Sequence, residues 1–424
     1  MGLGLGLLSY VPLLLGASRI LTPMGVRSAL GILLVAALLF GLRAVVGWDR
    51  RDRETRGHPA WAWAVAGVGS AYLALSFVSC LTPMEDHDGL AYHVYAPWRW
   101  LQLGTMSHLP THIHTQWPMG VEMLFALLLP VAGDSACKPL VGLFAALAAA
   151  ATYLLGARLG SRTAGLVAAA LIPLRAGAPS INTTSVEAAL TFHVVMAAVA
   201  LAAWRESRKV RARRAWFLMA VAFAGFACCT KLNGLLLAGF LGLAAAALMP
   251  PGTAPRARGM VAAGLVVGAV LTASPWYLRC WVQTGNPVYP FAYDLLGGEH
   301  WSRNASSVLA AYFHTFDTPG DSVAARHYAV VRHVWRTVTL ALMALLLPGP
   351  RWSRGFIAGS AAFAIVQMWA AHVHRFLLPA SPFAALVAAW WLVAVAGSRS
   401  EARARLSGLM APLGARAEQV VSRA

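Results

Sequence analysis

Three carboxylates lie within four consecutive positions of this sequence, at Glu85, Asp86 and Asp88. They belong to the stretch 83–122, in which acids, histidines and aromatic residues crowd together between flanks rich in Ala, Leu, Val and Gly. Carboxylates can act as general bases, and their oxygens suit hard divalent cations. These acids are therefore the first candidates for catalytic residues, and they also make a divalent cation a possible cofactor.

The spacing of the three acids leaves their individual roles open. Glu85 and Asp88 are three positions apart and would share one face of a helix, with Asp86 pointing elsewhere. Asp88 precedes the run GLAYH and can equally be the N-cap of a short helix. Tyr92 and His93 in this run are candidates for contacting a substrate or supporting the acid.

Two further acids stand at the edges of apolar segments. Glu122 opens a short apolar segment over residues 123–132, and Glu187 stands at the start of a longer one. A carboxylate inside a membrane costs about 2.5–3.5 kcal/mol at the centre of the bilayer, which favours a functional role. The alternative for Glu187 is a negative charge at a helix N-terminus, where it is stabilising anyway.

Cations that suit a phosphate occur at three separate places. Lys231 interrupts the run CCTKLNGLLL, Arg279 lies in SPWYLRCWVQTGNPVYPF, and His374 and Arg375 lie in HVHRFLLPASP. Each can bind an anion, although a lysine at the edge of an apolar run can also simply extend its amine to water. Convergence of these cations on one face would be more specific than any one of them.

The composition predicts the class of protein that carries these residues. Of the 424 residues, 58% are hydrophobic and 12% are charged, and the mean hydropathy is +0.62. Repeated apolar runs have the length of membrane-spanning helices, which need about 20 residues each. We therefore predict an all-α polytopic membrane protein with about twelve such helices. The predicted runs are residues 3–21, 28–47, 61–82, 139–157, 164–178, 186–204, 215–230, 232–249, 260–275, 335–349, 355–372 and 376–396.

The basic residues sort the connecting loops into two sides. The net charge of +18 comes mainly from arginines that cluster in alternate loops. This is the positive-inside pattern of membrane proteins rather than a nucleic-acid footprint. The alternation holds only if the segment 123–132 does not span. It then places both termini in the cytoplasm and the stretch 83–122 on the outer face of the cytoplasmic membrane.

This topology divides the chain into four parts. Residues 1–60 form two N-terminal membrane helices, and residues 61–300 form the module that contains the outer loop 83–122. Residues 301–396 supply a further outer loop and the last membrane helices, and residues 397–424 form a basic cytoplasmic tail. The five cysteines have no CxxC spacing, so no zinc knuckle is indicated.

A set of ordered motifs resembles a known family. HDGLAYHVYAPWRWLQLG, WPMGVEMLFAL, CTKLNGLLL, PWYLRCWVQTGNPVYPF and HRFLLPASP follow one another as in the bacterial GT-C superfamily of membrane glycosyltransferases. These are relatives of the protein O-mannosyltransferases and lipid A aminoarabinose transferases. The resemblance implies a GT-C-like bundle with juxtamembrane helices in the first long outer loop.

The resemblance also implies roles for individual residues. Asp88 matches the catalytic acid best, with Asp86 and Glu85 as alternatives, while Glu187 matches a second acid and Lys231 a lysine that faces phosphate. The implied reaction moves a sugar from a polyprenyl-phosphate-linked donor to a lipid, polysaccharide or protein acceptor. Two extra helices ahead of the acidic loop depart from the family pattern.

Two other classes of protein fit the same composition. A secondary transporter would explain charges within an apolar chain, but it predicts repeated halves and a site at the bilayer midplane. The charges here collect at one face instead. The third interpretation is a non-catalytic subunit of an assembly complex for envelope polysaccharide.

Overall fold

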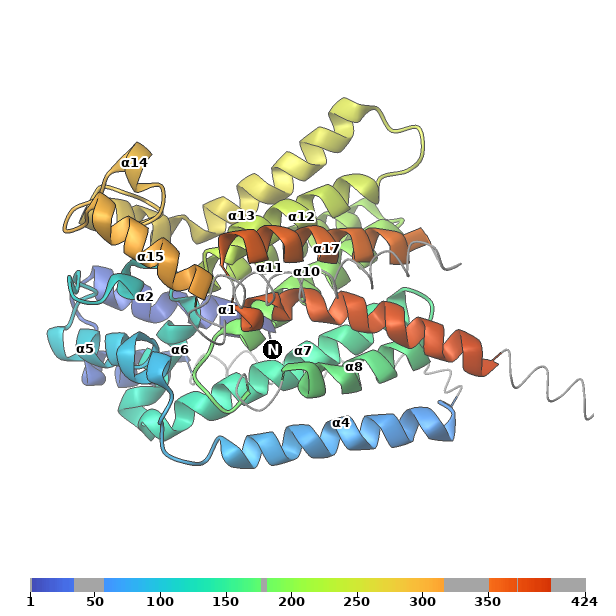
Figure 1. The fold of residues 1–424 in the computed structure, drawn as a ribbon, viewed down its shortest axis with the longest axis horizontal. Helices are drawn as coiled ribbons and strands as arrows, with labels where there is room; N and C mark the ends of the chain where they lie inside the picture. Colours follow the sequence, from blue (N-terminus) through green and yellow to red (C-terminus); the bar gives the residue numbers. More distant parts are fainter. Residues whose placement is uncertain (1, 34–56, 177–180, 316–350, 372, 398–424) are drawn as a thin grey trace, which may run out of the picture.

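The computed structural model describes residues 2–33, 57–176, 181–315, 351–371 and 373–397. These residues form an all-helical bundle without a strand, apart from an isolated antiparallel bridge between Leu21 and Gly104. Figure 1 shows long helices running roughly side by side, with the shorter elements α2, α5, α14 and α15 gathered at one end. The predicted all-α class is confirmed for this part of the chain.

Six helices of the described residues are long and apolar enough to cross a membrane. They are α4 (Ala60–Ser79), α7 (Cys137–Arg158), α10 (Glu187–Glu206), α11 (Val210–Thr230), α13 (Pro255–Thr284) and a segment over Arg375–Gly397. The shorter apolar helices include α8 (Arg162–Ala176), α12 (Asn233–Ala247) and α17 (Arg351–Ala370). The predicted runs 28–47 and 335–349, and the tail, lie wholly or largely outside the described residues. The expected count of about twelve spans is therefore not confirmed.

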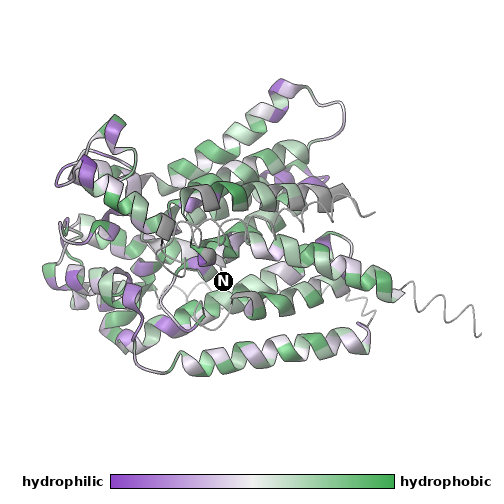
Figure 2. Cartoon of the chain, viewed as in Figure 1, coloured by the Kyte–Doolittle hydropathy of each residue, from purple (hydrophilic) through white to green (hydrophobic). Residues whose placement is uncertain are grey.

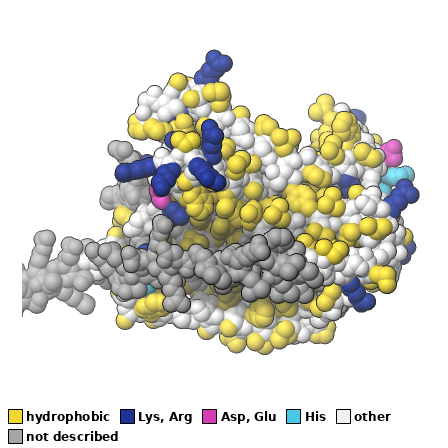
Figure 3. Space-filling view, turned by 180° about the vertical axis from the view of Figure 1, so that it is seen from behind, with side chains coloured by type: hydrophobic (Ala, Val, Ile, Leu, Met, Phe, Trp, Pro, Cys, Tyr) yellow, Lys and Arg dark blue, Asp and Glu magenta, His cyan; other side chains and the backbone are white. Residues whose placement is uncertain are grey.

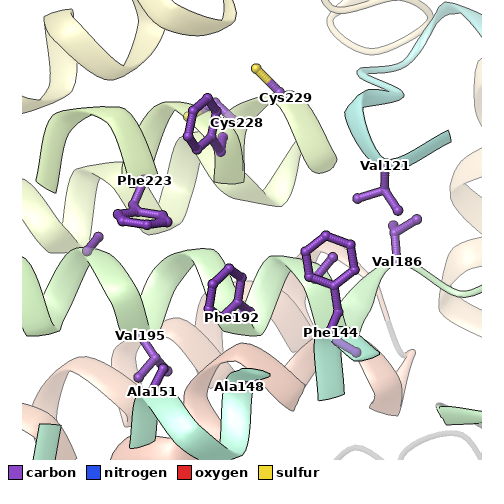
Figure 4. Packing of buried hydrophobic residues seen from close by; sticks show 14 of the residues in the cluster. Val121, Phe144, Ala148, Ala151, Val186, Phe192, Val195, Phe223, Cys228 and Cys229 are labelled. Atoms are coloured by element: carbon purple, nitrogen blue, oxygen red, sulfur yellow. The ribbon is translucent and has the colours of Figure 1, made fainter. Parts of the chain in front are cut away.

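The central element of the bundle is α10. It packs against α7, α11, α12 and the 3-10 helix η4 (His374–Ala380). Of an 18-residue apolar stretch of α10, 89% is buried. The corresponding share is 17% for α4, which packs against α8 at the edge of the bundle. A helix that is apolar all round is stable when it is enclosed on all sides. Figure 4 shows part of this packing, in which Phe192 of α10 lies near Phe144 and Phe223 and Val195 lies beside Ala151 of α7.

The N-terminal segment differs from the predicted single span over residues 3–21. It forms two short helices, α1 (Gly2–Leu8) and α2 (Tyr10–Ala17), which meet at Ser9. Pro12 supplies a physical reason for the break, because its ring clashes with the carbonyl of the residue four positions earlier. The segment lies against α6 and α11, and it ends beside the stretch 83–122 at the Leu21–Gly104 bridge.

The stretch 83–122 forms several short elements at one end of the bundle. They are the π-helix η1 (Gly89–His93), α5 (Tyr95–Leu103), the 3-10 helix η2 (Ile113–Gln116) and the start of α6 (Gly120–Ala132). With 13 residues, α6 is too short to cross a membrane, as the topology argument predicted. Figure 2 shows hydrophilic residues at this end and at the opposite end of the bundle, with hydrophobic residues along the long helices between them.

The remaining short elements complete the same end. They are the 3-10 helix η3 (Asp134–Ala136), α14 (Tyr293–Leu296) and α15 (Arg303–Thr315). The 30 residues of α13 rise about 45 Å, more than the hydrocarbon core of a membrane. Its C-terminal turns therefore extend to the stretch 83–122. The proposed boundaries between the four parts of the chain stay a prediction.

Candidate functional site

Charged side chains at the ends of four separate elements lie close together. Glu187 is the first residue of α10, Lys231 follows the last residue of α11, and Arg375 lies in the first turn of η4. Asp88 immediately precedes η1. We call Asp88, Glu187, Lys231 and Arg375 the acid–cation cluster. The four residues are far apart in sequence, and the antiparallel course of α10 and α11 places Glu187 and Lys231 at the same end of the bundle.

The cluster is a connected set of ion pairs. Lys231 Nζ lies 2.7 Å from Glu187 Oε1, and Arg375 Nε lies 3.5 Å from the same oxygen. Arg375 also forms an ion pair with Asp88 and donates a hydrogen bond of 3.3 Å to Ser185 Oγ. Lys231 and Arg375 thus share the buried carboxylate of Glu187. Asp88 pairs with Arg375, the more exposed of the two cations.

The exposure of the side chains shows from which side the cluster is open. Glu187 is 1% exposed and Lys231 13%, whereas Asp88 is 16% and Arg375 28% exposed. A ligand approaching the cluster therefore meets Arg375 and Asp88 before it meets Lys231. Lys231 is also covered by an aromatic ring, because its Nζ lies 3.6 Å from the ring centre of Phe376.

Asp88 is held in its ionised form. Burial by itself would raise the pKa of its carboxyl, but the Arg375 guanidinium, followed by His93 and Lys231, more than offsets this effect. The pKa of Asp88 is therefore lowered from its ordinary value. A carboxylate in this environment is charged at neutral pH and is a weak base for as long as Arg375 stays bound to it.

The hydrogen bonds of Asp86 differ from those of Asp88. Its Oδ2 accepts hydrogen bonds from the Gly89 backbone N–H at 2.9 Å, the Thr184 backbone N–H at 3.3 Å and Thr184 Oγ1 at 2.7 Å. Asp86, not Asp88, thus caps the first turn, and it ties η1 to the segment before α10. Asp88 occupies the N-cap position of η1, as one interpretation of the sequence allowed, but its side chain makes no capping hydrogen bond and pairs with Arg375.

Glu85 stands apart from the cluster. Its side chain is exposed, and no ion pair of Glu85 occurs within the described part of the chain. Of the three acids in the stretch 83–122, only Asp88 forms an ion pair with a cation of the cluster within the described residues. Asp88 is thus the one of the three that contacts a cation of the cluster, and its role as the base stays a prediction.

A second buried pair lies beside the cluster. His93 Nδ1 is 2.6 Å from Glu122 Oε1, and both side chains are at most 6% exposed. Tyr92 stacks on His114 with ring centres 4.3 Å apart, and burial raises its pKa well above the ordinary value. Burial likewise lowers the pKa of His114 to about 4, so this ring is neutral at pH 7. Tyr92, His93 and Glu122 therefore form one compact wall of the site.

Arg279 contacts two backbone carbonyls and an aromatic ring rather than the residues of the acid–cation cluster. Its Nη1 donates to the Thr115 carbonyl at 2.9 Å, its Nε donates to the Met106 carbonyl at 3.3 Å, and its guanidinium lies 4.8 Å from the centre of the Trp100 ring. It fastens α13 to the stretch 83–122. Within the described residues, no hydrogen bond or ion pair joins Arg279 to the acid–cation cluster. The side chain of His374 lies outside the described part of the chain.

Several residues of the site were missed by sequence reasoning. Thr184 and Ser185 bind Asp86 and Arg375, and Phe376 covers Lys231. Tyr312 of α15 is near enough for Asp88 and Arg375 to influence it, with burial as the main reason for its raised pKa. Thr184 and Ser185 precede Glu187 by two or three residues, and this proximity is the one signal that could have pointed to them.

The acids of this end do not fit a divalent cation. Asp86 faces Thr184 and Asp88 faces Arg375, so their oxygens do not converge. Within the described part of the chain, no group of three or more His, Cys, Asp or Glu side chains has the geometry of a metal site. The arrangement instead suits an anion that could bind between Lys231 and Arg375.

The fold and the site define a polytopic helical membrane protein with a charged cluster at one end of its bundle. Comparison with known proteins gives little beyond this class. No family model matches the sequence. No curated protein matches it at the significance required.

Two solved structures resemble the chain in fold. They are ArnT from Cupriavidus metallidurans bound to undecaprenyl phosphate, with a TM-score of 0.49, and the same protein in the apo state, with a TM-score of 0.48. Both are 19% identical to this chain, and each match covers 78% of it. The chain spans about 60% of the length of the ArnT chains. This resemblance concerns the path of the backbone alone.

Proposed function

We propose that the chain is a membrane glycosyltransferase of the GT-C type. It would move a sugar from a polyprenyl-phosphate-linked donor to a lipid, polysaccharide or protein acceptor at the outer face of the cytoplasmic membrane. The observation that carries the proposal is the acid–cation cluster. It combines an ionised acid suited to accept a proton with two cations suited to hold a phosphate, at one end of a hydrophobic bundle.

The position of the cluster fits a substrate that is anchored in lipid. Such a donor keeps its isoprenoid chain in the bilayer and presents its phosphate at the membrane–water boundary. Glu187, Lys231 and Arg375 lie at the ends of apolar helices, and that is the depth at which this phosphate would arrive. A lone carboxylate at this depth would be costly, so Glu187 has a clear role in holding both cations in place.

The transfer step follows from the proton and charge balance. Asp88 takes the proton of the acceptor hydroxyl or amine, the acceptor atom bonds to the anomeric carbon, and the bond from that carbon to the phosphate oxygen breaks. The electron pair of that bond leaves with the polyprenyl phosphate, whose added negative charge Lys231 and Arg375 stabilise. Tyr92, His93 and Glu122 would line the place of the sugar.

The ion pair between Arg375 and Asp88 suggests how donor binding prepares the base. A donor phosphate competes with Asp88 for the Arg375 guanidinium. When Arg375 turns to the phosphate, Asp88 loses the interaction that keeps its pKa low. The acid thereby becomes a stronger base only in the complex with the donor.

The direct test is sugar transfer by purified protein in vesicles that contain polyprenyl-phosphate sugars and envelope acceptors, with products identified by mass spectrometry. Asp88→Asn should reduce the rate by roughly 10²–10⁴-fold, the usual contribution of a positioned proton acceptor. Asp294→Asn is the matched control, because Asp294 lies at the same end and its pair with Arg303 is exposed. Wild-type transfer by Asp88→Asn would contradict the assignment of the base.

A solute-uptake assay in the same vesicles separates the proposal from a transporter. Uptake by the wild-type protein without any sugar transfer would contradict the proposed function. An unchanged envelope glycan profile in cells that carry only Asp88→Asn would favour a non-catalytic subunit instead.

A further inference from the structure

A hollow lies at the end of the bundle opposite the acid–cation cluster. It has a volume of about 480 Å³ and lies where the C-terminal end of α10 meets the N-terminal halves of α11 and α13. Its apolar lining includes Trp204, Phe217, Leu218 and Val261, and its charged lining consists of Arg213 and Arg214. This combination of surfaces has no part in the proposed transfer reaction.

The two arginines carry charge that the neighbouring acid does not neutralise. Glu206 is the nearest acid along the chain, and it pairs with Arg158 at 2.7 Å. Within the described part of the chain, no carboxylate lies at ion-pair distance from Arg213 or Arg214. The Arg213 guanidinium lies 5.0 Å from the centre of the Trp204 ring, a contact that holds the charge beside the apolar wall.

The hollow lies at the depth of a membrane surface. The 20 residues of α10 rise about 30 Å from Glu187 to Glu206, which is the thickness of the hydrocarbon core. Figure 3 shows Lys and Arg side chains gathered at one end of the molecule beside a broad hydrophobic belt. An occupant that meets both surfaces must therefore have an anionic group at the boundary and an apolar part in the bilayer.

We infer that this hollow binds an anionic phospholipid, with its phosphate at Arg213 and Arg214 and part of an acyl chain against Trp204, Phe217 and Val261. Basic pockets between membrane helices on the cytoplasmic side are a known form of anionic headgroup recognition. A soluble anion would leave the apolar wall uncovered, and a zwitterionic lipid would leave the two arginines without a net partner charge. The anionic phospholipid satisfies both surfaces.

The test is native mass spectrometry of the full-length protein, purified in detergent and mixed with equal amounts of phosphatidylglycerol and phosphatidylcholine. The wild-type protein should retain phosphatidylglycerol preferentially. The double variant Arg213→Ala/Arg214→Ala should lose roughly 20- to 30-fold in affinity for it, since each basic residue near an anionic surface contributes about fivefold. Val261→Trp should lower retention of both lipids by filling the hollow while leaving both arginines in place.

Arg256→Ala is the matched control, because Arg256 is an exposed arginine in the first turn of α13 at the same end of the bundle. It should retain phosphatidylglycerol as the wild type does. Unchanged retention by the double variant, equal loss in Arg256→Ala, or equal retention of the two lipids by the wild type would each overturn the inference. Self-association that Val261→Trp abolishes while lipid retention stays intact would assign the hollow to a second copy of the chain. A melting temperature near that of the wild type confirms that each variant is folded.

Discussion

At the scale of single residues, the pair of Asp88 and Arg375 decides how strong the proposed base is. Asp88 must be ionised to accept a proton, so activity is lost as the pH falls through its pKa. In the free protein Arg375 lowers that pKa, and in the donor complex the phosphate would draw Arg375 away. The acid limb of the pH profile should therefore lie at higher pH for kcat than for kcat/KM, because the two report the complex and the free protein.

The variant Arg375→Gln tests the cause of this difference. It removes the cation from the free protein, so the acid limb of kcat/KM should move up toward that of kcat. Donor binding should also weaken, which raises KM. Coincident acid limbs in the wild-type protein would argue against the exchange of Arg375 between Asp88 and phosphate.

The same residue scale includes the buried pair of Glu187 and Lys231. Glu187→Gln leaves Lys231 without its carboxylate, and breaking one side of such a pair costs about 3–5 kcal/mol of folding free energy. The double variant Glu187→Gln/Lys231→Met should recover much of this loss, since it also removes the unpaired amine. Denaturant unfolding of the purified variants measures the effect.

Glu206→Gln provides the control for this pair on the same helix. Glu206 pairs with Arg158 at the opposite end of α10, where both side chains are at least 34% exposed. Its loss should change the free energy of unfolding by less than about 1 kcal/mol. Equal losses in Glu187→Gln and Glu206→Gln would show that Glu187 has no special role in the bundle.

At the scale of elements, Asp86 joins η1 to the segment before α10. Asp86→Ala removes the acceptor of three hydrogen bonds and should destabilise the protein by about 1–3 kcal/mol. Gly89→Ala should act on the same junction, because an added Cβ would lie 2.5 Å from Thr184 Oγ1 and 2.6 Å from Asp86 Oδ2. Thermal unfolding monitors both variants.

Glu85→Ala is the neighbouring control for the junction. Glu85 is exposed, so its loss should stay within about 0.5 kcal/mol. If Asp86→Ala unfolded at the wild-type temperature and lost transfer completely, Asp86 would be a catalytic residue rather than a structural one. The alternative assignment of the base to Asp86 would then hold.

At the scale of the whole molecule, the proposed orientation can be tested with single cysteines. The five native cysteines are buried, so they should react little with a maleimide that does not cross membranes. Ser135→Cys and Ser302→Cys are exposed positions at the end that carries the acid–cation cluster, and both should be labelled in intact cells. Arg208→Cys and Arg256→Cys at the other end should be labelled only after the membrane is opened.

The reverse labelling pattern would place the cluster in the cytoplasm and exclude the proposed acceptors in the envelope. Labelling of all four positions in intact cells would mean that the cells leak, so a cytoplasmic protein with a known cysteine serves as the control. The positive-inside pattern predicts the first outcome.

The sequence by itself determined the class of protein and much of its organisation. Long apolar runs cannot be exposed to water, so composition alone led to a helical membrane bundle, and α7, α10, α11 and α13 lie where their runs were predicted. The length of residues 123–132 excluded a span, and α6 is indeed short. Glu187 and Lys231 were singled out because charges at apolar segments are costly, and Asp88 because it belongs to a cluster of three carboxylates. Arg375 was singled out as a cation suited to bind phosphate.

Only the tertiary structure decided which of these charges meet. Asp86 and Asp88 differ by two positions, yet one accepts hydrogen bonds from Thr184 and the other binds Arg375. Arg279 looked equivalent to Arg375 and instead fastens α13 to Thr115. Such pairing depends on how helices that are far apart in the sequence pack together, and the local spacing of residues does not specify this packing.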